Sequence, residues 1–126
     1  GRVVDRTAVV GTDHSWHFTT YLDAGRRMRI TCQLLAADGH LLATTTADAA
    51  DPGWLAAAAG ACAAGAHLFV PTDTGIVRVE RDSDRLCVAR TFPDTEPFVD
   101  AGSRLHAGPS GLIAVTGGRI LRLAFT

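Results

Sequence analysis

The sequence contains no lysine and no asparagine, and all of its 12 basic residues are arginines. Lysine and asparagine have A-rich codons, so their absence, together with abundant alanine, indicates a bacterial genome of high GC content, of the actinobacterial kind. The use of arginine instead of lysine therefore follows from the source genome. It is not a sign of a basic binding site.

The chain also lacks a strong charge and a long hydrophobic run. Its formal net charge of −1 gives no reason to expect nucleic acid or an anionic membrane as a partner. No apolar run approaches the roughly 18 residues of a membrane helix, and the first ten residues lack the hydrophobic region of a signal peptide. We therefore expect a cytoplasmic protein.

Cysteine is scarce. The three cysteines, Cys32, Cys62 and Cys87, are odd in number and isolated, and no two of them have CxxC spacing. This pattern excludes a disulfide framework and a zinc site built on cysteine pairs. It predicts free thiols in a reducing compartment.

The clearest secondary-structure pattern lies in residues 67–92. A run of β-forming residues at 68–70, closed by Pro71, precedes a turn. In 76–81 valines alternate with charged residues, which is typical of a strand buried on one face. A polar turn then leads to a third strand that begins near residue 86. Three short strands joined by tight turns predict an antiparallel meander.

Weaker copies of this pattern flank the central stretch. HFTTYLDAG at 17–25 resembles HLFVPTDTG at 67–75, and GLIAVTGG at 111–118 opens a third copy. The turn glycines of the copies recur at roughly 40 to 50 residues, a period found in solenoids and propeller blades. The small-residue segments RTAVV, AAAAGACAAG and SRLHAG precede the copies, and we interpret them as innermost strands. In the first copy we expect further strands at 16–22, 28–35 and 40–46.

The alanine-rich segment also has a helical interpretation. Asp51 is a candidate N-cap, Pro52 suits a first helical position, and helix-forming residues follow. Glycines at 60 and 65 and the lack of a polar face argue against a long helix. If the alanine-rich segment forms a strand, the chain has an all-β fold. If it forms a helix at 52–64, the chain is a small α+β domain.

The repeat predicts an all-β fold of antiparallel four-stranded blade-like units, forming a β-propeller or part of one. The chain is expected to be a single domain or partial propeller with units at about 1–50, 51–98 and 99–126, the last of them incomplete. The phrases LFVPTDTGIVRVE and FPDTEPFVD resemble propeller segments of actinobacterial multi-component systems that contain a MoxR-type ATPase and a von Willebrand factor A domain. The resemblance covers mainly 61–125. It implies a protein-interaction scaffold and assigns no functional residues, because the Trp-Asp and Gly-His signatures of WD repeats are absent.

About three blades cannot close a ring, because propellers need roughly four to eight. Each end sheet would expose a face meant for burial, and Leu123 and Phe125 would lie on an unpaired edge. We therefore expect the ring to be completed by a second copy, which would give six blades, or by a complementary propeller fragment.

Candidate site residues are few. Asp13, His14 and His17 come nearest to a metal cluster, but residues three apart on a strand point to opposite faces and no fourth ligand is visible. We therefore expect no metal and no cofactor. Six residues are candidate ligand or interface contacts, each with a structural alternative in the core or at a strand start: Trp16, Trp54, His17, His67, Arg104 and His106.

The expected function is a non-enzymatic propeller module, or half of one, that serves as a scaffold for other proteins. The alternative is a lectin-like propeller with a ligand pocket between blades, lined by the tryptophans or histidines. A hydrolase is disfavoured because the small innermost segments offer almost no acid, base or metal ligand.

Overall fold

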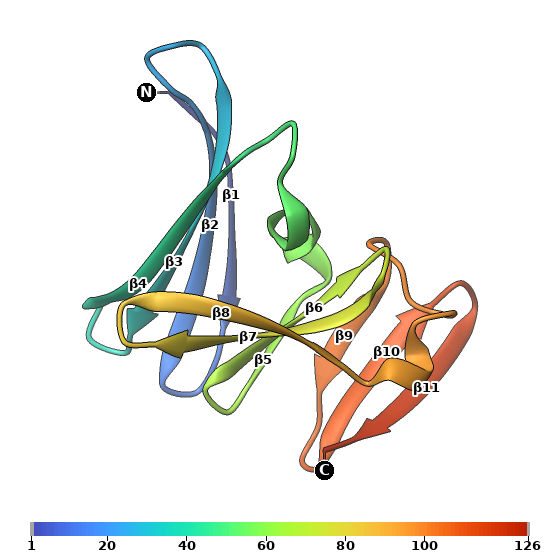
Figure 1. The fold of residues 1–126 in the computed structure, drawn as a ribbon. Helices are drawn as coiled ribbons and strands as arrows, with labels where there is room; N and C mark the ends of the chain where they lie inside the picture. Colours follow the sequence, from blue (N-terminus) through green and yellow to red (C-terminus); the bar gives the residue numbers. More distant parts are fainter. Residues whose placement is uncertain (1, 126) are drawn as a thin grey trace.

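The computed structural model describes residues 2–125 as three antiparallel sheets (Figure 1). The first sheet contains β1 (Arg2–Val10), β2 (His14–Leu22), β3 (Met28–Ala36) and β4 (Leu41–Asp48). The second contains β5 (Cys62–Ala64), β6 (His67–Thr72), β7 (Gly75–Asp82) and β8 (Arg85–Thr91). The third contains β9 (Arg104–Ala107), β10 (Gly111–Thr116) and β11 (Arg119–Ala124). Two four-stranded sheets and one three-stranded sheet confirm the all-β, blade-like prediction.

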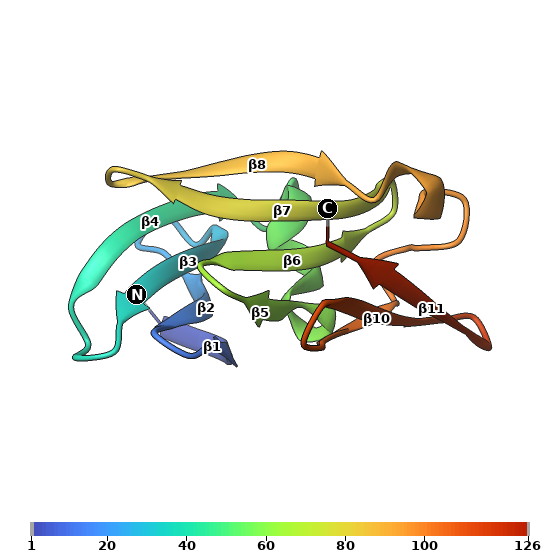
Figure 2. The same ribbon diagram turned by 90° about the horizontal axis from the view of Figure 1, so that it is seen from below.

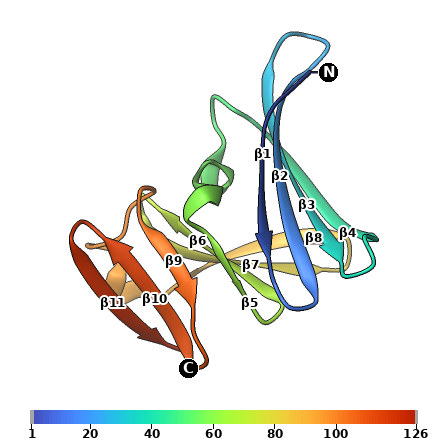
Figure 3. The same cartoon turned by 180° about the vertical axis from the view of Figure 1, so that it is seen from behind.

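Within each sheet the strands follow one another in chain order, so every connection is a hairpin. The second sheet lies between the other two, which fan out on its two sides (Figures 1 and 3). The first strands are neighbours, because β5 contacts both β1 and β9. Figure 2 shows β1 and β5 along one side of the molecule and β4 and β8 along the other. The sheets are therefore arranged like consecutive blades of a propeller, and they do not close a ring.

The sequence repeat corresponds to the hairpin between the second and third strands of each sheet. Gly25, Gly75 and Gly118 all lie at this connection. Gly75 and Gly118 have φ angles of 115° and 84°, which side chains other than glycine rarely adopt. The turn glycines of the repeat thus mark equivalent positions in the three sheets.

A hydrophobic core joins the first sheet to the second. Trp16 lies between Val9 and Leu34 on neighbouring strands, and its side chain is almost fully buried. The opposing residues, Leu68 and Val79 of the second sheet, belong to the same core. Alternation along each strand directs these side chains to one face, as the period of two predicted.

A second core joins the second sheet to the third. Phe69 and Ile76 are buried there against Leu105, Leu112 and Ala114 of the third sheet. The second sheet is therefore covered on both faces. Residues 68–70 are all buried for this reason, because their alternate side chains enter two different cores.

The alanine-rich segment follows neither sequence interpretation completely. The 3₁₀ helix η1 (Gly53–Gly60) occupies most of it, and the innermost strand is limited to β5. The predicted inner strand is thus correct only for 62–64. The alternative α+β domain with a helix at 52–64 is wrong for the described residues, because η1 is short, interrupted at Ala57 and buried on several sides. It has no polar face that would favour a surface α-helix.

Pro71 does not end its strand, although the sequence predicts that the strand at 68–70 stops there. β6 continues through Pro71, which pairs with Ile76 and is fully buried. Proline lacks a backbone N–H, but a strand tolerates it where that group is not needed in the ladder.

The short 3₁₀ helix η2 (Pro93–Thr95) connects the second sheet to the third. The Thr95 hydroxyl donates a hydrogen bond to the carbonyl oxygen of Phe92 over 2.6 Å. Farther along, the Thr116 hydroxyl donates to the carbonyl oxygen of Phe98 over 2.7 Å. The first bond stabilises the turn at η2, and the second holds the connection against the third sheet.

Candidate interaction surfaces

The first and third sheets each have one face that no other described residue covers. On the third sheet this face is formed by every second residue of its strands. Ile113, Val115 and Ile120 are 38%, 41% and 71% exposed, although large apolar side chains are usually buried. Val115 pairs directly with Ile120, so the exposed apolar side chains are contiguous.

Basic residues surround this apolar centre. Ile113 lies between His106 and Arg122 across the strands, and Val115 pairs with Arg104. No acidic residue occurs after Asp100 in the sequence. The open face of the third sheet is therefore apolar at its centre, with Arg104 and Arg122 beside the apolar side chains.

The open face of the first sheet has a different character. Thr19, Thr31 and Thr46 form one row across it, with 3.0 Å between the hydroxyl oxygens of Thr31 and Thr46. Tyr21 and Gln33 line the same shallow depression. Apolar side chains are exposed beside this polar row: Val3, which pairs with Tyr21, is 45% exposed, and Val10, which pairs with Ser15, is 76% exposed. Both end sheets therefore expose apolar side chains, and those of the third sheet are contiguous.

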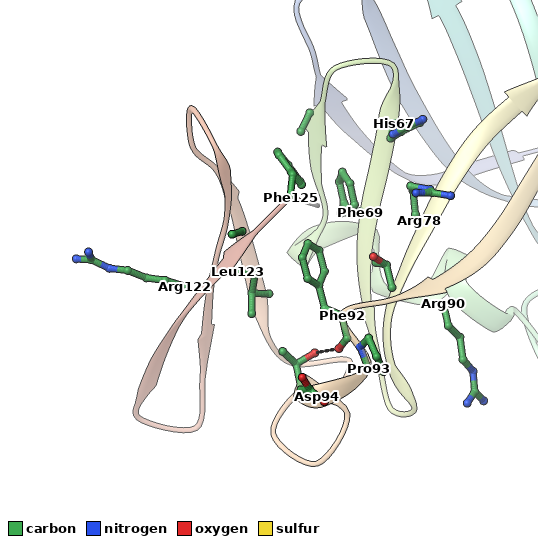
Figure 4. Close-up of a pocket in the computed structure, with 14 residues that line it drawn as sticks. His67, Phe69, Arg78, Arg90, Phe92, Pro93, Asp94, Arg122, Leu123 and Phe125 are labelled. Atoms are coloured by element: carbon green, nitrogen blue, oxygen red, sulfur yellow. Dashed lines mark hydrogen bonds between the residues drawn. The ribbon is translucent and has the colours of Figure 1, made fainter.

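A groove of about 820 Å³ runs between the second and third sheets. On one side lie Phe69 and Phe92, and on the other lie Leu123 and Phe125. The centroids of Phe69 and Phe125 are 5.6 Å apart, and Phe92 is 6.2 Å from Phe69. Figure 4 shows the three rings close together, with Arg122 pointing away from them. The floor of the groove is consequently aromatic.

Two unusual features lie in this groove. Phe92 has φ 50°, a left-handed conformation that costs free energy for a bulky residue and is found mostly at functional positions. The Nε atom of Arg78 is buried without a hydrogen-bond partner. The Arg78 guanidinium lies 3.9 Å from Glu80, so one weak ion pair leaves most of its donors available.

The structure places the six candidate residues in separate environments. Trp16 is 1% exposed and belongs to the first core, and Trp54 packs edge-on against Phe18 with centroids 6.1 Å apart. The ring of His17 lies 2.8 Å from the Ser15 hydroxyl on the open face of the first sheet.

The other three candidates lie farther along the chain. His67 lines the aromatic groove, and its Nε2 atom lies 3.0 Å from a carboxylate oxygen of Glu80. Arg104 and His106 are exposed on the open face of the third sheet. The six residues therefore do not form one site.

Sequence reasoning selected His67, Arg104 and His106 on these surfaces but missed most of the apolar residues there. Ile113, Val115 and Ile120 lie in a segment where both alternating faces are apolar, and this signal was available in the sequence. Phe69, Phe92 and Phe125 are brought together only by the packing of two sheets, so no local pattern reveals the groove.

The two buried thiols are inert. Desolvation by burial raises the pKa of Cys32 to about 12 and that of Cys62 to about 11. Cys87 is exposed on β8. All three thiols are free in the structure.

Among residues 2–125, no group of three or more histidine, cysteine or acidic side chains is arranged to bind a metal ion. Within the same range, no helix has the length and apolar character needed to span a bilayer. Comparisons with protein-family models, with curated proteins and with solved structures find no match to this chain.

Proposed function

We propose that this chain is a non-enzymatic propeller segment that acts as a protein-interaction scaffold and forms a ring with further blades. One observation carries the proposal: the middle sheet is buried on both faces, whereas the third sheet leaves Ile113, Val115 and Ile120 exposed. Contiguous exposed apolar side chains rimmed by polar ones are typical of interaction surfaces. The free thiols agree with a reducing cytoplasm.

A second copy is the partner proposed for ring closure. Two chains related by a two-fold axis would bring the third sheet of each against the first sheet of the other. Such a ring has six blades, within the range of closed propellers. The threonine hydroxyl groups in the row across the first sheet can then accept hydrogen bonds from the arginines of the third sheet.

Paired cysteine variants test this arrangement. Val115→Cys and Thr19→Cys place thiols near the centres of the two open faces, on the second strands β10 and β2. In a Cys87→Ser background, we expect a covalent dimer when the two variants are mixed and oxidised mildly. Neither variant alone should cross-link, because each places its thiol on only one side of the contact.

Absence of the mixed dimer, with both variants folded, would contradict closure by a second copy. A complementary propeller fragment would then be the partner to seek. Circular dichroism before oxidation provides the folding control.

A further inference from the structure

A pocket between the innermost strands is the basis of a further inference. It has a volume of about 480 Å³ and is lined by residues 7–10 of β1, by 58–63, where η1 leads into β5, and by 104–107 of β9. We propose that this pocket binds a small organic phosphate, with Arg104 and His106 as the residues that hold the anion. The inference goes beyond the proposed scaffold function, because it assigns a small-molecule site within one chain.

Four elements from all three sheets meet around the pocket. β5 contacts both β1 and β9, and η1 contacts the same two strands. Figure 3 shows β5 between β1 and β9. Ala58 belongs to the core between the first and second sheets, whereas Cys62 and Leu105 belong to the core between the second and third. Buried residues therefore fix the walls of the pocket in place.

The pocket contains basic residues and no acidic ones. Arg104 and His106 are both exposed and line it, and its lining includes no aspartate or glutamate. Among residues 2–125, neither Arg104 nor His106 belongs to an ion pair. Burial raises the pKa of Cys62 to about 11, so its thiol adds no negative charge at neutral pH. The charges of the pocket therefore favour an anion.

The spacing of the two basic residues favours phosphate among the anions. Arg104 and His106 are two residues apart on β9, so their side chains leave the strand on the same side. A guanidinium group can bind two oxygens of one ligand. A carboxylate has only these two, whereas a phosphate group has a third oxygen that can accept a hydrogen bond from His106. The pair therefore fits a phosphate group better than a carboxylate.

The remaining walls leave room for the organic part of the ligand. Alanine is the commonest residue of the lining, at positions 8, 58, 59, 61, 63 and 107. Short apolar side chains leave space beside the basic pair, and apolar ligand surface that they cover is removed from water. A volume of about 480 Å³ is within the range of small-molecule sites. An organic phosphate thus fills the pocket better than inorganic phosphate.

Phenyl phosphate is the probe for this site, with calorimetric titration to measure affinity. It should bind at least about threefold more tightly than inorganic phosphate, which lacks the apolar group, and than benzoate, which has two oxygens. Phenol, which carries no charge, should not bind. In NMR spectra the amide shifts of 58–63 and 104–107 should change on addition of phenyl phosphate.

Variants test the role of each part of the pocket. Arg104→Gln should weaken the binding of phenyl phosphate at least about tenfold, and His106→Ala at least about threefold. Ala59→Leu keeps the charge but fills part of the pocket, so it should weaken binding at least about tenfold. Position 59 is exposed, so this variant should fold. Arg122→Gln removes a charge from the same sheet outside the pocket and is the matched control, with an effect of less than about twofold.

Equal effects of Arg104→Gln and Arg122→Gln, or full binding by a folded Ala59→Leu protein, would overturn the inference. Equal binding of benzoate and phenyl phosphate would also overturn it, as would shift changes confined to residues outside the pocket. Circular dichroism shows whether each variant is folded. A dimer that ignores phenyl phosphate would overturn this inference alone. A chain that binds phenyl phosphate and stays monomeric would contradict closure by a second copy alone.

Discussion

The ring of Phe125 stacks on the ring of Phe69, with centroids 5.6 Å apart and planes inclined by 28°. This contact joins the last described residue to the middle of the second sheet. Phe125 lines the aromatic groove, and Phe69 belongs to the core between the second and third sheets.

Substitution of Phe125 by alanine should therefore loosen the third sheet. Because the side chain is 42% exposed, we expect a loss of about 1 kcal/mol in the free energy of unfolding. Urea denaturation measures the change. Arg85→Ala, at an exposed position at the start of β8, is the control and should change the free energy by less than about 0.5 kcal/mol. Equal effects of the two substitutions would contradict the packing role of Phe125.

Gly60 lies where η1 passes close to the strand entering the third sheet. A Cβ atom at this position would overlap the backbone oxygen of Ser103 and lie 3.0 Å from Cγ of Pro71. Gly60→Ala should cost about 2 kcal/mol or more, because neither backbone nor buried proline can move freely.

Gly108→Ala is the matched control for this change. Its nearest neighbouring atom would be 3.6 Å from the added Cβ, so stability should stay within about 0.5 kcal/mol. Thermal unfolding of the two variants measures the difference in stability. A Gly60→Ala protein as stable as the parent would contradict the close approach of Gly60 to Ser103 and Pro71.

The thiols should differ in reactivity. At pH 8 the raised pKa values of Cys32, about 12, and Cys62, about 11, keep both groups protonated. Iodoacetamide should thus label one thiol per native chain, the exposed Cys87, and three in urea. Mass spectrometry counts the labels. Labelling of two or three thiols in the native chain at the rate seen in urea would show that the cores are open.

Asp23 should give a small pH dependence of stability. A backbone hydrogen bond from the Arg27 N–H, over 2.9 Å, is the main cause that lowers the pKa of Asp23 below 3.8, and Arg29 adds to it. Because the folded pKa is lowered, the contribution is present above the unfolded pKa and is lost as pH falls through the folded pKa.

The Asp23→Asn variant should accordingly be less stable than the parent at pH 7. The difference should shrink as the pH falls below 3.8. Urea titrations at several pH values provide the measurement. A difference that persists unchanged at low pH would show that the charge of Asp23 has no role.

The repeat in the sequence was sufficient to predict the sheets, because alternation and turn glycines are local signals. The match of 17–25 with 67–75 places β2 and β6 at equivalent positions, as the structure confirms. The structure of the alanine-rich segment was harder to predict, because small apolar residues are compatible with both a strand and a helix. Its 3₁₀ form depends on burial between the sheets around Leu55 and Ala58, which no local pattern contains.

The surfaces were less accessible to sequence reasoning. Tryptophan and histidine often contact ligands, but the side chain of Trp16 is buried in the core. Phe92 enters the groove through a left-handed backbone conformation that its residue type does not suggest. The open face of the third sheet was visible in principle, because residues 111–116 are apolar on both alternating faces and acidic residues are missing after Asp100.

The central claim is that these three sheets are part of a ring completed by a second copy. Light scattering on a size-exclusion column, repeated over a range of concentrations, measures the absolute mass directly. We expect twice the chain mass of 13.2 kDa, in one sharp peak. A single peak at the mass of one chain at every concentration would contradict closure of the ring by a second copy.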